Sequence, residues 1–163
     1  MSEIIVNLGI PQLKKYLANR YPYLLIDKAI EVIPGVSAKG YKNMTANEWF
    51  FPVHFPEDPM MPGMIQMEAL LQMLSLTVLT LDGNQGLVVQ GVAADKIRLK
   101  RRVIPGCRLE IEAELISWDS EIAVGRARGS IDGSEACSGE FTFKLVEPPN
   151  YKADMGEGSN NDE

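Results

Sequence analysis

One segment of the sequence, from Met61 to Leu81, is apolar on nearly every side, and it constrains the fold more than any other segment. A helix with this pattern is either buried in a protein core or placed in a membrane. Gln66, Glu68 and Gln72 interrupt the apolar pattern of the segment. Pro62 suits the first turn of a helix, and the residues at 82–84, Asp-Gly-Asn, end it. These features favour a buried helix, which the rest of the chain must enclose.

Most of the remaining sequence predicts strands. The expected strands cover residues 24–33, 36–44, 86–94, 97–103, 108–117, 122–131 and 136–146, and a short helix is expected at 11–17. Turn signals such as Pro-Gly and Asp-Gly separate neighbouring strands, which is typical of hairpins in an antiparallel sheet. The sequence therefore predicts an α+β fold in which such a sheet wraps one long helix.

The length of 163 residues and the 45% share of hydrophobic residues are those of one compact domain with a real core. We expect this domain at residues 1–147 and a disordered, acidic tail at 148–163. The N-terminus lacks the basic and apolar regions of a secretory signal, so a cytoplasmic location is expected. The formal charge of −6 argues against a general nucleic-acid-binding protein.

The sequence offers few ligands for a metal ion. Cys107 and Cys137 are isolated from each other, and His54 is the only histidine of the chain. We therefore expect two reduced structural thiols and no metal site.

The strongest functional signal comes from His54 and Glu68. His54 lies between Pro52 and Pro56, which stiffen its loop, and a neutral imidazole can act as a base at pH 7. Glu68 lies 14 positions later in the apolar helix, where burial would raise its pKa and let it donate a proton near neutral pH. The structural alternatives are that His54 is only hydrogen-bonded to a nearby carbonyl, and that Glu68, Gln72 and Ser75 form a polar stripe of the helix that faces solvent.

A neutral base and a protonated carboxyl are the groups that removal of water from a 3-hydroxyacyl group requires. The base takes the proton next to the carbonyl, and the acid gives a proton to the departing hydroxyl. Backbone N–H groups at the start of the helix, where Gly63 permits close approach, would stabilise the negative charge that develops on the carbonyl oxygen. Residues 54–68 therefore predict this dehydration.

Three sequence segments indicate a protein family more specifically than the spacing of His54 and Glu68 does. "RYPYLLIDK", "HFPEDPMMPGMIQMEALLQ" and "DKIRLKRRVIPGCRLEIEAEL" resemble, in the same order, segments of the bacterial FabZ-type 3-hydroxyacyl-[acyl-carrier-protein] dehydratases. The resemblance covers residues 8–146. It implies a hot-dog fold, in which a long helix is wrapped by an antiparallel sheet. It also implies a lyase without a cofactor that acts on acyl groups carried on phosphopantetheine.

The resemblance implies roles for single residues as well. His54 matches the family's catalytic histidine, Glu68 its catalytic acid, and Gly63 the residue whose backbone N–H holds the thioester carbonyl. Further contacts with the substrate are expected from Val53, Phe55, Met64 and Gln72. In the family, the histidine comes from one subunit and the acid from its partner, so we expect a homodimer, which can assemble into a trimer of dimers. A related branch that also isomerises the double bond has Asp in place of this Glu, so simple dehydration is favoured.

A basic strip consists of Lys96, Arg98, Lys100 and Arg102. These residues alternate with their neighbours around the strand expected at 97–103, which would place them on one face. Such a face is either ordinary charged surface or, given the resemblance, a docking site for an acidic acyl carrier protein and its phosphate.

Two departures from the family pattern bear on function. Val53 stands where the family has Gly, so we expect an acyl tunnel of different shape. Glu57 and Asp58 add negative charge near His54, which weakens the approach of an acidic carrier. Two other functions therefore stay open: thioester hydrolysis on the same fold, and non-catalytic acyl binding in a specialised pathway.

Overall fold

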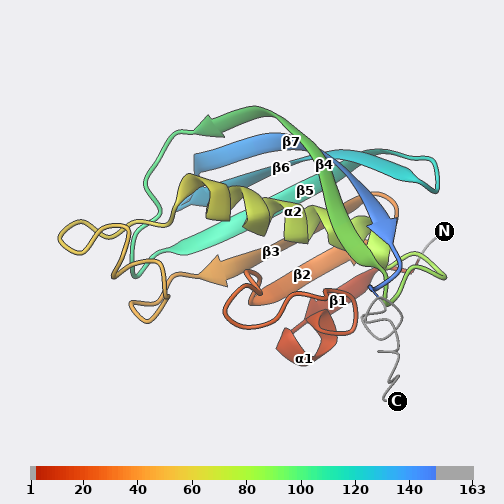
Figure 1. Ribbon diagram of the computed structural model, residues 1–163, viewed down its shortest axis with the longest axis horizontal. Coiled ribbons are helices and arrows are strands. Elements are labelled where there is room, and N and C mark those ends of the chain that lie inside the picture. The colour runs from red at the N-terminus through yellow and green to blue at the C-terminus, as the bar shows by residue number, and fades with distance from the viewer. Residues whose placement is uncertain (1–2, 150–163) are drawn as a thin grey trace, which may run out of the picture.

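A single long helix crosses a curved antiparallel sheet in the computed structural model, which describes residues 3–149 (Figure 1). The strands are β1 Ile5–Leu8, β2 Lys28–Ile33, β3 Ser37–Asn43, β4 Val88–Leu99, β5 Arg108–Trp118, β6 Ile122–Ile131 and β7 Ser134–Val146. The helices are α1 Ile10–Leu13 and α2 Gly63–Leu79. This arrangement is the α+β hot-dog fold, as the sequence predicted.

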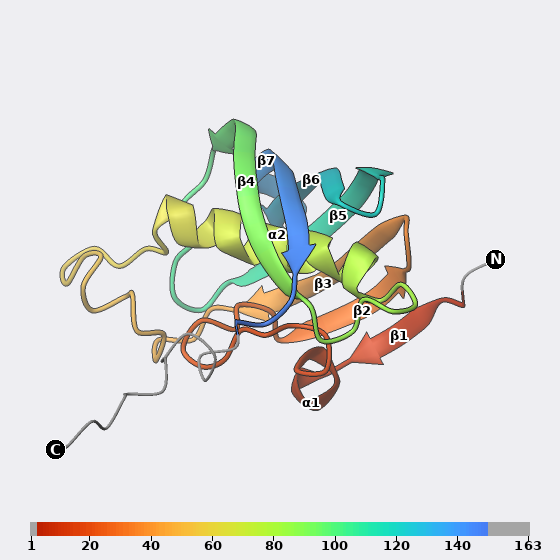
Figure 2. The same ribbon diagram turned by 45° about the vertical axis from the view of Figure 1, so that its right-hand side comes forward.

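The strands follow the order β1-β2-β3-β5-β6-β7-β4, and every neighbouring pair is antiparallel. The last strand of the part that the structure describes, β7, lies between β6 and β4. Strand β4 is therefore paired on one side only within residues 3–149. Figure 2 shows the sheet curling around α2, with β4 and β7 side by side. Most of the tail expected at 148–163 lies outside the described residues, and the domain bounds stay a prediction.

Two glycines set how closely α2 approaches the sheet. A Cβ atom added to Gly125 on β6 would lie 2.5 Å from Leu74 Cδ1, and one added to Gly40 on β3 would lie 2.7 Å from Met73 Cε. Both distances are shorter than van der Waals contact, and the same Cβ atoms would also clash with backbone of the neighbouring strands, 2.0 Å from Lys28 O at Gly40 and 2.8 Å from Glu114 O at Gly125, so a larger residue fits at neither position. Leu74 and Met73, which pack over these glycines from α2, are fully buried.

The expected strands at 86–94 and 97–103 differ from the structure, because a single strand, β4, covers most of the first and only the start of the second. A bulge between Asp95 and Arg98 keeps the strand paired with β7 through the polar residues that suggested a break. Lys96 at this bulge has a φ of 50°. Strand β4 ends at Leu99, so residues 100–103 are not part of a strand.

The N-terminal region also differs from the expected elements. Strand β1 has no counterpart among them, the strand expected at 24–33 begins only at Lys28, and the helix expected at 11–17 is the single turn α1. The remaining expected strands and α2 lie within a few residues of their expected bounds.

Candidate active site

The loop between β3 and α2 carries His54 and projects beyond the N-terminal end of α2 (Figure 1). Main-chain hydrogen bonds hold the histidine on both sides. Its N–H donates to the carbonyl oxygen of Phe50 at 2.9 Å, and its own carbonyl accepts from the N–H of Met60 at 2.9 Å. These main-chain hydrogen bonds therefore fix the backbone position from which the imidazole side chain extends.

The imidazole Nδ1 lies 3.0 Å from the carbonyl oxygen of Met60. Because a carbonyl only accepts, Nδ1 carries the proton in this contact, and Nε2 of the neutral ring keeps its lone pair. The ring of Phe55 stacks on the imidazole with 4.3 Å between the ring centroids. A hydrogen bond to a nearby carbonyl and a role as base are therefore compatible, since each uses a different nitrogen.

Glu68 lies in the second turn of α2 and is half-buried, not enclosed as the apolar pattern suggested. Its Oε1 accepts a hydrogen bond from Gln72 Nε2 at 3.0 Å. The same amide also donates to the carbonyl oxygen of Tyr23 at 2.9 Å, and Gln72 Oε1 accepts from the N–H of Leu25 at 2.8 Å. Gln72, which is buried, thus uses both its amide protons within the chain and orients the carboxyl. A direct contact of Gln72 with substrate stays a prediction.

Tyr23 is a neighbour of Glu68 that the sequence did not reveal. Burial raises the pKa of its hydroxyl, and the negative charge of Glu68 raises it further. The phenol of Tyr23 therefore stays protonated at neutral pH. No local pattern links Tyr23 to the helix, so spacing along the chain could not have found it.

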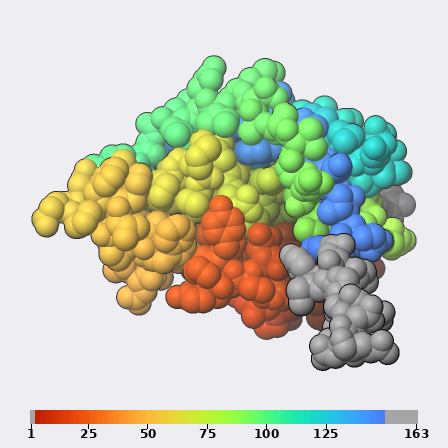
Figure 3. Space-filling model, viewed as in Figure 1, coloured from red at the N-terminus to blue at the C-terminus, as the bar shows by residue number. Residues whose placement is uncertain are grey.

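A hollow of about 330 Å³ runs along α2 beside Glu68. Its walls are residues 17–19 after α1, one face of α2 that includes Glu68 and Gln72, and residues 87–89 with Gly91 at the start of β4. Figure 3 shows α2, in yellow, reaching the surface between β4, in green, and the N-terminal segment, in orange. Largely apolar walls with one carboxyl suit an acyl chain whose reactive centre lies near that carboxyl.

The other predicted site residues lie outside this hollow. Three of them are exposed apolar side chains: Val53, Phe55 and Met64. Gly63 begins α2, and a Cβ atom there would lie 2.5 Å from Leu99 Cδ1, so a ligand at this glycine would have to displace a half-exposed leucine. His54 is also absent from the walls of the hollow. Within one chain, the predicted base therefore does not line the hollow that contains the predicted acid.

All four residues of the basic strip are exposed, but three are ion-paired. The pairs are Lys96 with Glu140, Lys100 with Glu135, and Arg102 with Asp58. Arg98 has no carboxylate partner among residues 3–149, and its guanidinium donates to the carbonyl oxygen of Ile97. The bulge at Lys96 and the end of β4 at Leu99 also break the alternation that would place all four on one face. Carrier docking on this strip stays a prediction.

The pair between Arg102 and Asp58 changes the charge of the histidine loop. Glu57 and Asp58 were expected to repel an acidic carrier, but the guanidinium of Arg102 offsets one of these two charges. The repulsion expected from the loop is therefore smaller than the sequence suggested.

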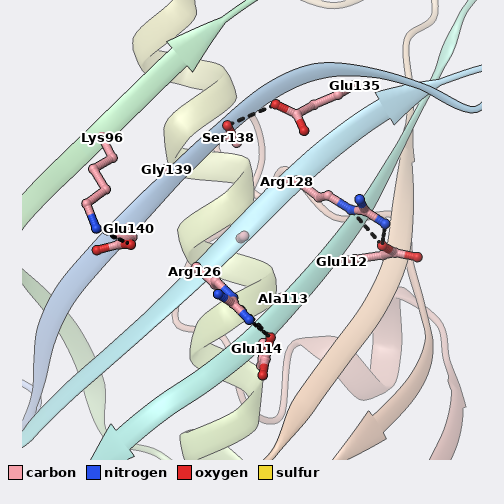
Figure 4. A pocket seen from close by; sticks show the side chains of 11 residues that line it. Lys96, Glu112, Ala113, Glu114, Arg126, Arg128, Glu135, Ser138, Gly139 and Glu140 are labelled. Atoms are coloured by element: carbon pink, nitrogen blue, oxygen red, sulfur yellow. Dashed lines mark hydrogen bonds and ion pairs between the residues drawn. The ribbon is translucent and has the colours of Figure 1, made fainter.

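The face of the sheet that points away from α2 carries a second hollow, of about 490 Å³ (Figure 4). Its charged side chains pair across neighbouring strands: Arg126 with Glu114, Arg128 with Glu112, and Lys96 with Glu140. Every Lys and Arg in its walls therefore has a carboxylate partner.

The described residues contain no group of three His, Cys, Asp or Glu side chains that could hold a metal ion. Cys107 and Cys137 are free thiols. Burial raises the pKa of Cys137 to about 11, so this thiol is protonated and unreactive at neutral pH. No helix within residues 3–149 is long and apolar enough to cross a membrane.

Comparison with known proteins links this geometry to a family. The sequence model of a family described as a FabA-like domain matches residues 17–140. The 3-hydroxyacyl-[acyl-carrier-protein] dehydratase FabZ of Clostridium novyi is 40% identical over 138 residues, which are 85% of this chain and 97% of the relative. The enzyme of the same name from Bacillus subtilis is 42% identical over 136 residues, which are 83% of this chain and 96% of the relative.

Solved structures agree on the fold. The dehydratase heterocomplex ApeI:P from Xenorhabdus doucetiae matches with a TM-score of 0.71 at 14% identity and covers 89% of this chain and 97% of the other. An uncharacterized protein from Pyrococcus horikoshii matches with a TM-score of 0.64 at 14% identity and covers 88% and 97%. At this identity the likeness shows the fold alone. The family match and the curated relatives show more, since they establish that this chain belongs to the FabA-like family and, within it, to the FabZ dehydratases.

Proposed function

We propose that the protein dehydrates a 3-hydroxyacyl thioester, carried on acyl carrier protein, to the trans-2-enoyl thioester in fatty-acid or related acyl-chain biosynthesis. The observation that carries the proposal is the carboxyl of Glu68, oriented by Gln72 in a hollow with largely apolar walls. The FabZ relatives, which match nearly over their whole length, support the same reaction.

In this reaction Nε2 of His54 takes the proton from C2 of the acyl group. Glu68 gives its proton to the hydroxyl on C3, the C3–O bond breaks, a C2–C3 double bond forms and water leaves. The imidazolium then returns its proton to the carboxylate, directly or through solvent, which restores both groups. The chemistry needs no metal ion and no cofactor beyond the phosphopantetheine that carries the substrate.

The start of α2 supplies the third element of the proposed site. The N–H groups of Ile65 and Gln66 both donate to the carbonyl oxygen of Pro62. The earlier N–H groups, of Gly63 and Met64, have no acceptor within the helix, as is usual for a first turn. In the proposal they bind the thioester oxygen as it gains negative charge.

The proposed enzyme is a homodimer whose sites are shared between two chains. In one chain, His54 does not line the hollow that contains Glu68. The side chains next to the histidine are apolar and exposed, with Val53 at 63% and Phe55 at 51%, and β4 offers an edge for pairing with a second copy. Both features support a dimer in which the histidine loop of one chain covers the hollow of the other. Assembly into a trimer of dimers stays a prediction.

Partner and location complete the proposal. The acidic carrier would approach the basic strip, where Arg98 offers a cation without a carboxylate partner among residues 3–149. The free thiols fit a reducing compartment, which supports a cytoplasmic location.

The test is to incubate the purified protein with 3-hydroxyacyl carrier protein of several chain lengths and weigh the products by mass spectrometry. A product lighter by about 18 mass units, one water, supports dehydration. Free acid together with the carrier thiol would instead establish the thioesterase alternative. Unchanged substrate at every chain length would favour a binding protein. The structure offers no observation that favours either alternative.

A further inference from the structure

Lys42 is the only Lys, Arg, Asp or Glu that is buried among residues 3–149, with 5% of its surface exposed. It lies near the end of β3. Its ammonium is surrounded by three acceptors: Glu48 Oε1 at 2.5 Å, the carbonyl oxygen of Asn43 at 3.2 Å, and Asp27 Oδ2 at 3.4 Å. A buried ammonium needs such partners, because its loss of hydration is otherwise very unfavourable.

These partners tie together three parts of the chain. Asp27 precedes β2, Asn43 ends β3, and Glu48 lies in the turn that follows β3. Asp27 Oδ2 also accepts the N–H of Asn43 at 2.7 Å. The side chain of Glu48 is only 17% exposed, so solvent and salt screen its pair with Lys42 weakly.

A short path of contacts leads from Glu48 to His54. The carbonyl oxygen of Glu48 accepts the N–H of Phe51, and the carbonyl oxygen of Phe50 accepts the N–H of His54. Both phenylalanines are buried, so the turn between Glu48 and His54 cannot shift freely. The position of Glu48 therefore sets where the histidine loop leaves the sheet.

We propose that Lys42, through its ion pair with Glu48, is a positioning residue that holds the His54 loop so that Nδ1 reaches the carbonyl oxygen of Met60. Its effect on turnover rests on the dehydratase function proposed above. The effect on the imidazole does not, because it can be measured without substrate.

The chain provides a spectroscopic reporter and a matched control. His54 is the only histidine, so the ¹⁵N spectrum of its imidazole is unambiguous and reports which nitrogen carries the proton. Lys39 lies on the same strand and pairs with Glu31 at 3.1 Å, but its side chain is 50% exposed. Loss of an exposed pair should matter little, so Lys39→Met controls for the removal of a lysine from β3.

The experiment compares wild type, Lys42→Met, Lys42→Arg and Lys39→Met. In wild type and Lys39→Met, the neutral imidazole should carry its proton on Nδ1. In Lys42→Met, a substantial share of the proton should move to Nε2, because the bond to Met60 is lost. Lys42→Arg, which keeps the charge, should restore part of the wild-type spectrum. With carrier-bound substrate, Lys42→Met should lower kcat by about 10- to 100-fold, with a much smaller change in KM.

An imidazole spectrum of folded Lys42→Met identical to that of wild type would overturn the proposal. If Lys42→Met does not fold, Glu48→Gln decides, because Lys42 then keeps Asp27 as a carboxylate partner. A wild-type spectrum in Glu48→Gln would likewise overturn the proposal, and a shift of the proton to Nε2 would support it. A wild-type enzyme without dehydratase activity would refute the proposed function but leave this spectroscopic test intact.

Discussion

The two groups of the proposed acid–base pair are held in opposite ways. His54 is held by the main chain of its own loop, through Phe50 and Met60, which lie within six residues of it. Glu68 lies on a regular helix and is oriented by the side chain of Gln72. Gln72 in turn is hydrogen-bonded to Tyr23 and Leu25, which lie 49 and 47 residues earlier in the sequence. The base therefore depends on local structure, and the acid depends on tertiary structure.

The largest effects should follow from removing either group. His54→Ala and Glu68→Gln should each lower kcat by about 10²- to 10⁴-fold, since general acid–base catalysis contributes about this much. Steady-state kinetics would measure the loss, and circular dichroism would verify that each variant is folded. Near-normal turnover in either variant would remove that residue from the mechanism.

The next prediction is that His54 and Glu68 of one site come from different chains. Inactive His54→Ala and Glu68→Ala variants, co-expressed with different tags, should form mixed dimers in which one site receives both intact residues. With random pairing, activity should recover to about a quarter of that of wild type. Absence of recovery in verified mixed dimers would mean that each site is built within one chain.

A smaller effect should follow from disturbing the tertiary support of Glu68. Gln72→Leu leaves the N–H of Leu25 buried without a partner, so it should lower the free energy of unfolding by about 2–3 kcal/mol and kcat by about tenfold. Urea unfolding and kinetics would measure both.

Gln66→Leu is the matched control for Gln72→Leu. Gln66 is also buried on α2. Its Nε2 donates to the carbonyl oxygen of Met61 at 3.0 Å, whereas its Oε1 has no hydrogen-bond partner among the described residues. Gln66→Leu removes this hydrogen bond together with the unsatisfied acceptor, and the two effects partly offset each other, so the free energy of unfolding should change by about 1 kcal/mol or less. Equal destabilisation by the two variants would contradict a special role for Gln72.

The smallest effect is expected from substitutions outside both the His54 loop and the surroundings of Glu68. Replacing Arg98 and Lys100 by Glu should raise KM for carrier-bound substrate by about three- to tenfold at low salt, and less at high salt. Turnover of a small N-acetylcysteamine thioester should barely change. Equal losses on both substrates would mean that these residues support the site or the structure instead of the carrier.

The same contrast explains how much of the fold could be predicted from the sequence. The buried helix and the hairpin of β6 and β7 depend on local signals. Asp132 and Gly133 both have positive φ, as a two-residue hairpin turn requires, and the bounds predicted for β6 agree with the structure. Strand β1 is four residues long and is held by pairing with β2, a distant segment. Its own residues therefore contain no sufficient signal.

The features of the candidate site show the same contrast between local and tertiary structure. The prolines around His54 and the polar residues on α2 are visible in the sequence, so both residues could be selected as candidates. The bonds from Gln72 to Tyr23 and Leu25 join residues far apart in the chain, and the pairing of the basic strip with carboxylates depends on where the bulge in β4 falls. Neither could be derived from spacing.

The position of β7 in the sheet has a consequence for synthesis of the chain on the ribosome. Among the strands of residues 3–149, this one is the last to be made, yet it joins β6 to β4 and contributes Phe141 and Phe143 to the core. A nascent chain that ends before Ser134 has already produced α2 and β4, but β4 has no strand to pair with and the apolar helix lacks part of its cover. Such a chain exposes surface that chaperones and proteases recognise. Synthesis of β7, Ser134–Val146, therefore decides whether the helix made long before it is ever enclosed.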